Sequence, residues 1–293
     1  MGEARKRRMG DRKDGRRLRT LDPYNELAPF IMKVRTDASN YFSDSVEITE
    51  AERFLRANRI NGYPGMGMLH LFIAAYIRVA AQYPAINRFI SGQRIFARNN
   101  IEFVMTIKKE MRTDAAETTV KVAFNLNDTI FDVYKGLNSE IKKFKDVSET
   151  TGTDDAADSF MKLPRLLLKL IIFFLGVLDY FGKIPQSLIK VSPFHGSIII
   201  TDLGSIGMPP VYHHIYNFGN LPLFISLGAK RKTRELKADG TVLEQKLIDY
   251  TLAMDERCCD GFMFSQGIKL FRNLLRYPGA LEKPPETVVD DIV

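Results

Sequence analysis

Residues 68–82 constrain the fold most, because this run is apolar on nearly every side of a helix. The segment MLHLFIAAYIRVAAQ stops just before Pro84, a residue that disfavours helical backbone at the position before it. A helix that is hydrophobic all round has to be buried, so we predict a buried helix over 68–82. His70 lies in this run, and we interpret it as a satisfied core residue rather than as a ligand.

The length and composition indicate a globular protein. The chain has 293 residues and is 45% hydrophobic, enough for a core of ordinary size in one large domain or two small ones. Its two cysteines, Cys258 and Cys259, are adjacent, so they cannot build a disulfide framework, and a reducing, cytoplasmic compartment is expected. No apolar signal-peptide segment follows the N-terminal charges.

The positive charge is concentrated at the N-terminus. The first twenty residues carry nine Lys or Arg against three acidic residues, which accounts for +6 of the formal net charge of +7. The arm has no aromatic residue to interleave with its cations, which argues against specific nucleic-acid binding. We predict a flexible, solvated basic arm over residues 1–16, with weak attraction to polyanions or an anionic membrane surface as the alternative.

The first half of the chain alternates between extended and helical patterns. We expect extended backbone over 29–46, and a helix over 50–58 capped by Thr49 with Glu52 at the capping-box spacing. Extended runs follow at 87–90, 93–97, 101–108 and 118–125, and an amphipathic helix at 130–143. The polar, acidic stretch 146–160 lacks periodicity and is predicted to be an exposed linker.

Residues 162–183 form a strongly hydrophobic helix in this interpretation. Their polar positions, with Gly176, give one narrow seam on an otherwise apolar helix: Lys162, Arg165, Lys169, Asp179 and Lys183. The apolar stretch is shorter than the ~20 residues that cross a bilayer, which argues against a transmembrane helix. Two interpretations remain open, burial against the protein's own core or between subunits, and a position in a membrane interface.

The last third has the most regular pattern. Strands are expected at 197–201, 223–229, 241–247 and 250–254, and a helix at 262–275 follows the turn 255–261. Residues 284–293 are expected to form a C-terminal tail.

Two segments in this third are specific when taken together. Gly196 begins GSIIITDLGSIG, and Tyr250 begins YTLAMDERCCDG, which leads into Phe262. They resemble, in order and separation, the G-T-F-T-I-S-N-L-G-x-x-G and D-H-R-x-x-D-G segments of dihydrolipoyl acyltransferases of 2-oxo acid dehydrogenase complexes. The second is also similar to the H-x-x-x-D-G of chloramphenicol acetyltransferases. The helix followed by Tyr-Pro-Ala-Ile-Asn at 83–87 resembles a further family segment, and the resemblance covers residues 16–282.

This resemblance implies a fold, an assembly and a chemistry. The fold would be α/β, a two-layer sandwich of mixed β-sheet and helices, filled by a catalytic domain over 17–283. Family members assemble as homotrimers, some into larger cages, with the active site between neighbouring subunits, and they transfer acyl groups from coenzyme A. Carried over by position, Thr201 would stabilise the oxyanion, Asp260 would have a structural role before a helix that starts at Gly261, and Glu256 would replace the catalytic histidine.

The glutamate changes the expected chemistry. An imidazole, with a reference pKa near ~6.5, can take and return a proton near neutral pH, whereas a solvated carboxylate near ~4.3 is a far weaker base. Three interpretations stay open: Glu256 is a base tuned by its pocket, Asp255 and Arg257; the protein is a catalytically silent trimer used for assembly or regulation; or an imidazole comes from elsewhere, with His213-His214 as the paired candidate.

Other groups give weaker signals. Two adjacent cysteines lack zinc-ligand spacing and the four histidines show no ligand pattern, so no metal is expected. The pair Cys258-Cys259 is interpreted as ordinary packing, because a reactive thiolate needs nearby cations and access. The lipoyl and subunit-binding domains of full dihydrolipoyl acyltransferases have no counterpart in this sequence, so the acyl acceptor is expected to be a small molecule or a group on another chain.

Overall fold

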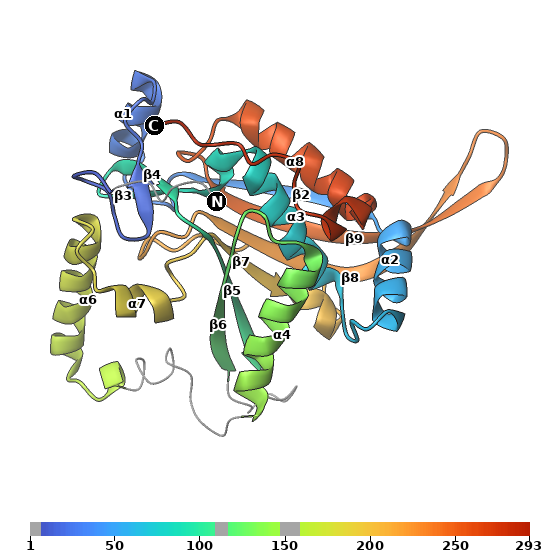
Figure 1. Ribbon diagram of the computed structural model, residues 1–293, viewed down its shortest axis with the longest axis horizontal. Helices are drawn as coiled ribbons and strands as arrows, with labels where there is room; N and C mark the ends of the chain where they lie inside the picture. The colour runs from blue at the N-terminus through green and yellow to red at the C-terminus, as the bar shows by residue number, and fades with distance from the viewer. Residues whose placement is uncertain (1–6, 109–116, 147–158) are drawn as a thin grey trace.

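A computed structural model describes residues 7–108, 117–146 and 159–293, and it shows a mixed β-sheet with helices packed on one face (Figure 1). Within these residues the main sheet has six strands in the order β2-β9-β8-β7-β5-β6, and a smaller sheet has the order β1-β4-β3. Strand β7 runs parallel to β5 and β8, and the other pairs are antiparallel. The expected two-layer α/β sandwich with a mixed sheet is confirmed.

The strands are β1 (Gly15–Arg17), β2 (Ser39–Glu47), β3 (Arg88–Ser91), β4 (Arg94–Arg98), β5 (Ile101–Lys108), β6 (Glu117–Phe124), β7 (Ile198–Asp202), β8 (Leu223–Leu236) and β9 (Val242–Asp255). The α-helices are α1 (Pro23–Ile31), α2 (Thr49–Ile60), α3 (Met68–Gln82), α4 (Ile130–Asp146), α6 (Arg165–Tyr180), α7 (Gln186–Val191) and α8 (Gly261–Arg276). Three 3-10 turns are η1 (Pro84–Asn87), η2 (Leu203–Ile206) and η3 (Pro278–Glu282).

Helix α3 fills the main core, with the bounds expected from the sequence. Its side chains pack with α4, α8 and the inward-facing residues of the sheet, such as Phe103, Ile200 and Leu252. His70 is held by the backbone N–H of Gly67, which donates to Nδ1 over 3.1 Å, and its Nε2 lies 3.3 Å from Asn138 Oδ1. The interpretation of His70 as a satisfied core residue is confirmed.

The opposite face of the sheet carries a second apolar cluster. Alternate strand residues point to this side, and the chain between η2 and β8 lies over them, giving one group of buried residues: Val104, Ile199, Ile215, Leu221, Phe224 and Ala253. Side chains in a strand alternate between faces, so Ile199 and Thr201 of β7 belong to this second face while Ile200 faces the helices.

Strands β8 and β9 form one long hairpin that extends beyond the helices (Figure 1). The two separate strands expected at 241–247 and 250–254 are wrong, because β9 runs without a break from Val242 to Asp255. The only irregularity is on the partner strand, where the register shifts between Leu227 and Lys230.

The expectations for residues 23–60 need two corrections. Helix α1 occupies Pro23–Ile31, so the extended region starts later than expected. Asp22 caps α1 by accepting hydrogen bonds from two backbone N–H groups, and Pro23 occupies the first turn, where its missing N–H costs nothing. Thr49 does not cap α2, because it is the first residue of the helix and Ile48 occupies the cap position. The Glu52 side chain is bound to Lys230 and Lys246.

The solvated arm expected over 1–16 is wrong from Asp11 onward; residues 1–6 lie outside the described residues. Arg12 is buried, and its guanidinium is paired with Asp14 and Asp179. Gly15–Arg17 forms β1 against β4. A charged run without apolar periodicity is typical of a solvated tail. The sequence alone does not show that Arg12 is buried with its acidic partners.

The C-terminal residues lie against the residues around β1 and β3. Val293 accepts a backbone hydrogen bond from Arg19, and Asp291 forms a buried ion pair with Arg88 at 2.5 Å. The tail 284–293 has no regular secondary structure, yet Val289 is bonded to the end of α3 through Ala81. The linker expected at 146–160 falls almost wholly outside the described residues.

Helix α6 stands apart from the helical layer, beside the small sheet (Figure 1). Most of its apolar side chains are exposed, so burial against the protein's own core is wrong for this segment. Among the described residues, no helix combines the length and apolar character needed to cross a membrane.

Candidate functional site

Thr201 is one of three hydroxyl residues that lie side by side across the sheet. The register pairs Thr201 of β7 with Ser226 of β8, and Ser226 with Thr251 of β9. By strand alternation all three belong to the face opposite the helices. Val211 lies over two of them: its N–H donates to Ser226 Oγ over 3.2 Å, and its carbonyl accepts from Thr251 Oγ1 over 2.5 Å.

The Thr201 hydroxyl is the one of the three that keeps no partner within the described part of the chain. Its residue is half-buried, at the end of β7. The turn that follows is held by Asp202, whose Oδ1 accepts the Ser205 N–H over 3.1 Å. Gly204 packs so closely on the Gly228 carbonyl that a Cβ built on it would lie 2.4 Å from that oxygen. The Asp-Leu-Gly turn therefore fixes Thr201 with its hydroxyl available.

Glu256 follows the last residue of β9 and is half-buried. Its N–H bonds to the Ala38 carbonyl over 2.9 Å, which extends the β2–β9 pairing by one residue. Its side chain accepts a hydrogen bond from Asn40, with Nδ2 and Oε2 separated by 2.7 Å. The carboxylate is thus held at one end of the sheet by the neighbouring strand β2.

The residues on either side of Glu256 are bonded to each other. Asp255 is fully buried, and its carboxylate takes two hydrogen bonds from Arg257, at 2.8 and 2.6 Å. Burial alone would lower the pKa of Arg257, but the bonds and charge of Asp255 raise it. Arg35 adds a longer ion pair, with Nε 3.9 Å from Asp255 Oδ2. This cluster stiffens the turn that carries Glu256.

Asp260 caps helix α8. Its Oδ1 accepts the Met263 N–H over 2.8 Å, its backbone is extended, and the helix begins at Gly261. Such caps satisfy one of the free N–H groups in the first helical turn. This hydrogen bond gives Asp260 a structural role at the start of α8.

Within one chain, Thr201 and Glu256 lie at opposite ends of the sheet. Through Ser226, the register places Thr251 of β9 opposite Thr201. Glu256 follows Thr251 by five residues in the direction of β9. At a rise of about 3.3 Å per residue and about 4.8 Å between strands, the two are separated by roughly 19 Å. One copy of the chain cannot bring both side chains to the same reacting bond.

The pair His213-His214 lies over the second face of the sheet rather than beside Glu256. The His213 ring stacks on Phe224, with centroids 4.2 Å apart. Burial, with the charge of His214, lowers the pKa of His213. Phe224 pairs with Ala253 of β9, and Ala253 precedes Glu256 by three residues. Along β8, Phe224 precedes Ser226, the partner of Thr201, by two residues.

Cys258 and Cys259 are free and buried. Burial, reinforced by Asp255, raises the pKa of the Cys258 thiol well above its usual range. Burial, reinforced by Asp260, raises the pKa of Cys259 to about 12. Neither thiol forms an appreciable amount of thiolate near neutral pH, which agrees with the interpretation of both as packing residues.

Sequence reasoning missed Asn40, Ser226 and Thr251. Nothing in a single sequence gives strand register, so the alignment of three hydroxyls was out of reach. Asn40 is a polar residue in a strand that was expected, and its pairing with Glu256 depends on β2 lying beside β9, a contact between distant parts of the chain.

Comparison with solved structures identifies the architecture. A probable dihydrolipoamide acetyltransferase from Listeria monocytogenes superposes with a TM-score of 0.53 at 14% identity, covering 86% of this chain and 88% of the other. The dihydrolipoamide acetyltransferase of Azotobacter vinelandii gives 0.51 at 15%, with 88% of each chain covered. A chloramphenicol acetyltransferase gives 0.50 at 13%, covering 88% of this chain and 100% of the other.

This chain has the chloramphenicol acetyltransferase-like fold. Comparison of its sequence with protein-family models and with curated proteins gave no match. The chloramphenicol acetyltransferase-like fold is thus recognisable from the shape of the chain and from the two short segments around Thr201 and Glu256.

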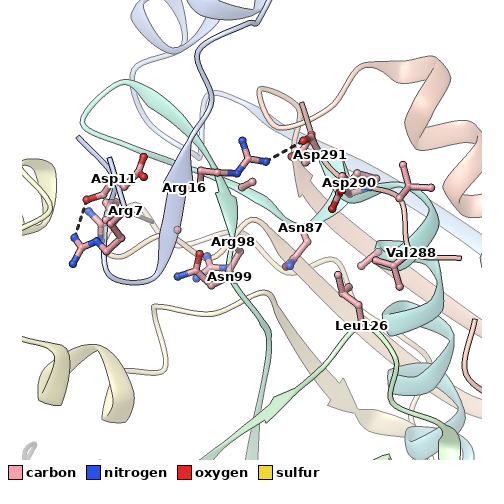
Figure 2. A pocket seen from close by; sticks show the side chains of 16 residues that line it. Arg7, Asp11, Arg16, Asn87, Arg98, Asn99, Leu126, Val288, Asp290 and Asp291 are labelled. Atoms are coloured by element: carbon pink, nitrogen blue, oxygen red, sulfur yellow. Dashed lines mark hydrogen bonds between the residues drawn. The ribbon is translucent and has the colours of Figure 1, made fainter. Parts of the chain in front are cut away.

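A separate cavity of about 260 Å³ lies between β1, β4 and the C-terminal tail, and neither Thr201 nor Glu256 lines it (Figure 2). Arg98 borders it, stacked over the Phe89 ring at 4.3 Å and bonded to Asn220. Across the cavity, the Arg16 guanidinium donates a hydrogen bond to the backbone carbonyl of Asp291 in the C-terminal tail, over 3.0 Å. No cluster of three or more His, Cys, Asp or Glu in the described ranges has metal-binding geometry.

Proposed function

We propose that this chain is a coenzyme A-dependent acyltransferase-fold protein that acts as a homotrimer, with Thr201 of one copy and Glu256 of a neighbouring copy in a shared site. The observation that carries the proposal is their separation of roughly 19 Å within one chain. In the fold that the chain adopts, two groups at opposite ends of the sheet can meet only across a contact between copies.

The proposed reaction moves an acyl group from a thioester to an acceptor. The base takes the proton of the acceptor thiol or hydroxyl, and the resulting nucleophile attacks the thioester carbonyl. The Thr201 hydroxyl donates a hydrogen bond to the oxyanion. The tetrahedral intermediate then collapses, the carbon–sulfur bond breaks, and the coenzyme A thiolate leaves with the proton from the base. The availability of the Thr201 hydroxyl supports this role.

Glu256 sets the rate of this reaction in the proposal. The Azotobacter enzyme was studied for catalytic roles of a serine, a histidine and an asparagine, of which the histidine and the asparagine lie four positions apart. Glu256 and Asp260 have the same spacing. With a carboxylate in place of the imidazole, the usual transfer is lost or strongly altered. The acceptor is proposed to be a small molecule or a group on another chain.

A second candidate is a catalytically silent trimer that serves assembly or regulation. The contact that favours it is the hydrogen bond from Asn40 to Glu256, which engages one carboxylate oxygen in a structural bond. In both candidates the buried, free Cys258-Cys259 pair supports the proposed cytoplasmic location.

Coenzyme A binding separates the two candidates. A ligand present at a hundred times its dissociation constant stabilises the folded state by ~2.7 kcal/mol. The acyltransferase proposal expects a rise in melting temperature with millimolar coenzyme A or acetyl-coenzyme A, and light scattering should give the mass of three chains. A trimer with no thermal shift would favour the silent assembly, and a monomer would refute the shared site.

Replacement of the glutamate tests the site itself. Glu256→His should create or increase thioester transfer to a small thiol, and Thr201→Ala in the same chain should reduce the gain by about 10²-fold, as loss of one oxyanion donor does. Glu282→His is the matched control, because Glu282 is an exposed acid far along the chain. Equal background rates in all variants would reject an inherited active site.

A further inference from the structure

Helix α6 exposes a continuous apolar strip along its whole length. Residues spaced by three or four lie on one side of a helix, and Leu166, Leu170, Phe173 and Val177 follow this spacing. Leu166 is 72% exposed and Phe173 is 63% exposed. Phe174 and Phe181 widen the strip, at 59% and 68%. An apolar surface of this kind marks a contact site rather than an ordinary solvated face.

The helix is held to the body of the protein by polar contacts at one end, which leaves the strip unused in folding. Asp179, in the last turn of α6, is bonded to Arg12 at 2.7 Å and lies 3.4 Å from His195 Nε2. Arg12 also donates to the Asp179 carbonyl over 2.6 Å, and Ser91 bonds the same carbonyl over 2.9 Å. These polar contacts of Asp179, which we call the anchor, place the Asp179 face of the helix against the body of the protein. The apolar strip lies on the opposite face of the helix.

The charges around the strip are positive. Residues 159–190 contain one acid, Asp179, which the anchor buries, and five basic residues: Lys162, Arg165, Lys169, Lys183 and Lys190. At about 100° per residue, Arg165 and Lys169 lie along one edge of the strip. The next acids towards the N-terminus, at 158 and 155, are outside the described residues.

We propose that α6 is an interfacial helix that lies on an anionic lipid surface. Its sixteen residues rise about 24 Å, less than the ~30 Å hydrocarbon thickness, so the helix lies in the surface rather than across it. An apolar face with basic residues at its edge is the pattern of helices that bury one side at the level of the lipid headgroups. A second copy of the chain is the alternative occupant, because the heterologous contacts of the proposed trimer would place the strip against a different surface of the neighbour. The mass in solution distinguishes this outcome from lipid binding.

Vesicle flotation tests the proposal with the full chain. The protein should float with vesicles of phosphatidylglycerol and phosphatidylcholine in equal amounts, and less with phosphatidylcholine alone or at high salt, because each basic residue near an anionic surface adds about fivefold to binding. The double variant Leu166→Ser, Phe173→Ser should bind at least about tenfold more weakly. These side chains are exposed, so circular dichroism should show an intact fold.

Val242→Ser is the matched control, because Val242 is a large apolar residue, 61% exposed, at the tip of the β8–β9 hairpin. It should float like the unaltered protein. Protein that remains at the bottom with both kinds of vesicle would overturn the proposal, and so would equal flotation of the double variant. If the double variant instead lowers the mass in solution and no form floats, the strip is a contact between copies and the lipid proposal is wrong.

Discussion

The buried cluster around Arg12 should contribute several kcal/mol to stability, and Arg12→Met tests it. The methionine fills much of the space of the arginine stem but removes its charge. Asp14 and Asp179 would then lose the guanidinium that pairs with both, at 2.8 and 2.7 Å. Removing one partner of a buried ion pair costs about 3–5 kcal/mol, because the other charge stays buried.

The pKa of Asp179 gives an independent magnitude. Burial alone would raise this pKa, but the bonds and charges of His195 and Arg12 lower it from 3.8 to about 2. A pKa lowered from 3.8 to about 2 corresponds to roughly 2–3 kcal/mol of preferential stabilisation of the charged form. That value covers the whole cluster around one carboxylate, so it is consistent with the larger cost expected when Arg12 leaves two carboxylates uncompensated.

The sign of the pH dependence follows from the same shift. Asp179 has a lower pKa in the folded state, so its contribution is complete above the unfolded value near ~3.9 and is lost as the pH falls through about 2. About half of it should remain at pH 3. The stability difference between the unaltered protein and Arg12→Met should therefore be constant near neutral pH and shrink below about pH 5.

Urea unfolding at pH 7 and at pH 3 measures both quantities. Arg94→Met is the control, because Arg94 is an exposed arginine on β4, where substitutions change stability by less than about 0.5 kcal/mol. A loss below about 1 kcal/mol for Arg12→Met at pH 7 would show that the guanidinium is solvated in solution. A difference that does not change between the two pH values would refute the role of Asp179.

Three further predictions concern the candidate site and its supports. Gly204→Ala should destabilise the fold by about 2–3 kcal/mol in urea unfolding, because its Cβ would meet the Gly228 carbonyl, whereas Gly176→Ala on α6 has open space and should stabilise it by about 0.5–1 kcal/mol. Cys258 and Cys259 should react with a thiol reagent at pH 8 only as fast as the protein unfolds; rapid labelling would contradict their raised pKa values. Asp260→Ala should cost about 1 kcal/mol through loss of the α8 cap, and Asp260→Asn only a few tenths; equal losses would argue against capping.

The sequence predicted the elements whose signal is local. Helix α3 has the bounds expected from its all-apolar pattern, and β5 those expected from alternation. The fold class came from two short segments, and comparison of the structure confirms it. The basic arm and the separate strands in β9 were wrong because the residues that decide them are far away in the chain: Asp179 buries Arg12, and β8 keeps β9 extended.

The candidate site was predicted by position and not by geometry. The sequence could assign Thr201 and Glu256 to motif positions, but their placement at opposite ends of the sheet depends on which neighbouring strands are parallel. That pairing also aligns Ser226 and Thr251 with Thr201. Asp260 was likewise assigned a structural role through the resemblance, and its capping hydrogen bond to the Met263 N–H is seen only in the structure.

The supports of position 256 have consequences for what its replacement can teach. Asp255 is locked by Arg257, Asp260 caps the helix that follows, and the Glu256 N–H is bonded to Ala38. None of these contacts involves the Glu256 side chain, so a histidine placed there should inherit the same backbone. If Glu256→His then gains no transfer while the trimer forms, a distorted backbone at 256 is not the cause, and the inherited active site is rejected. If the variant gains transfer, the glutamate at this single position accounts for the loss of acyl transfer by a histidine base.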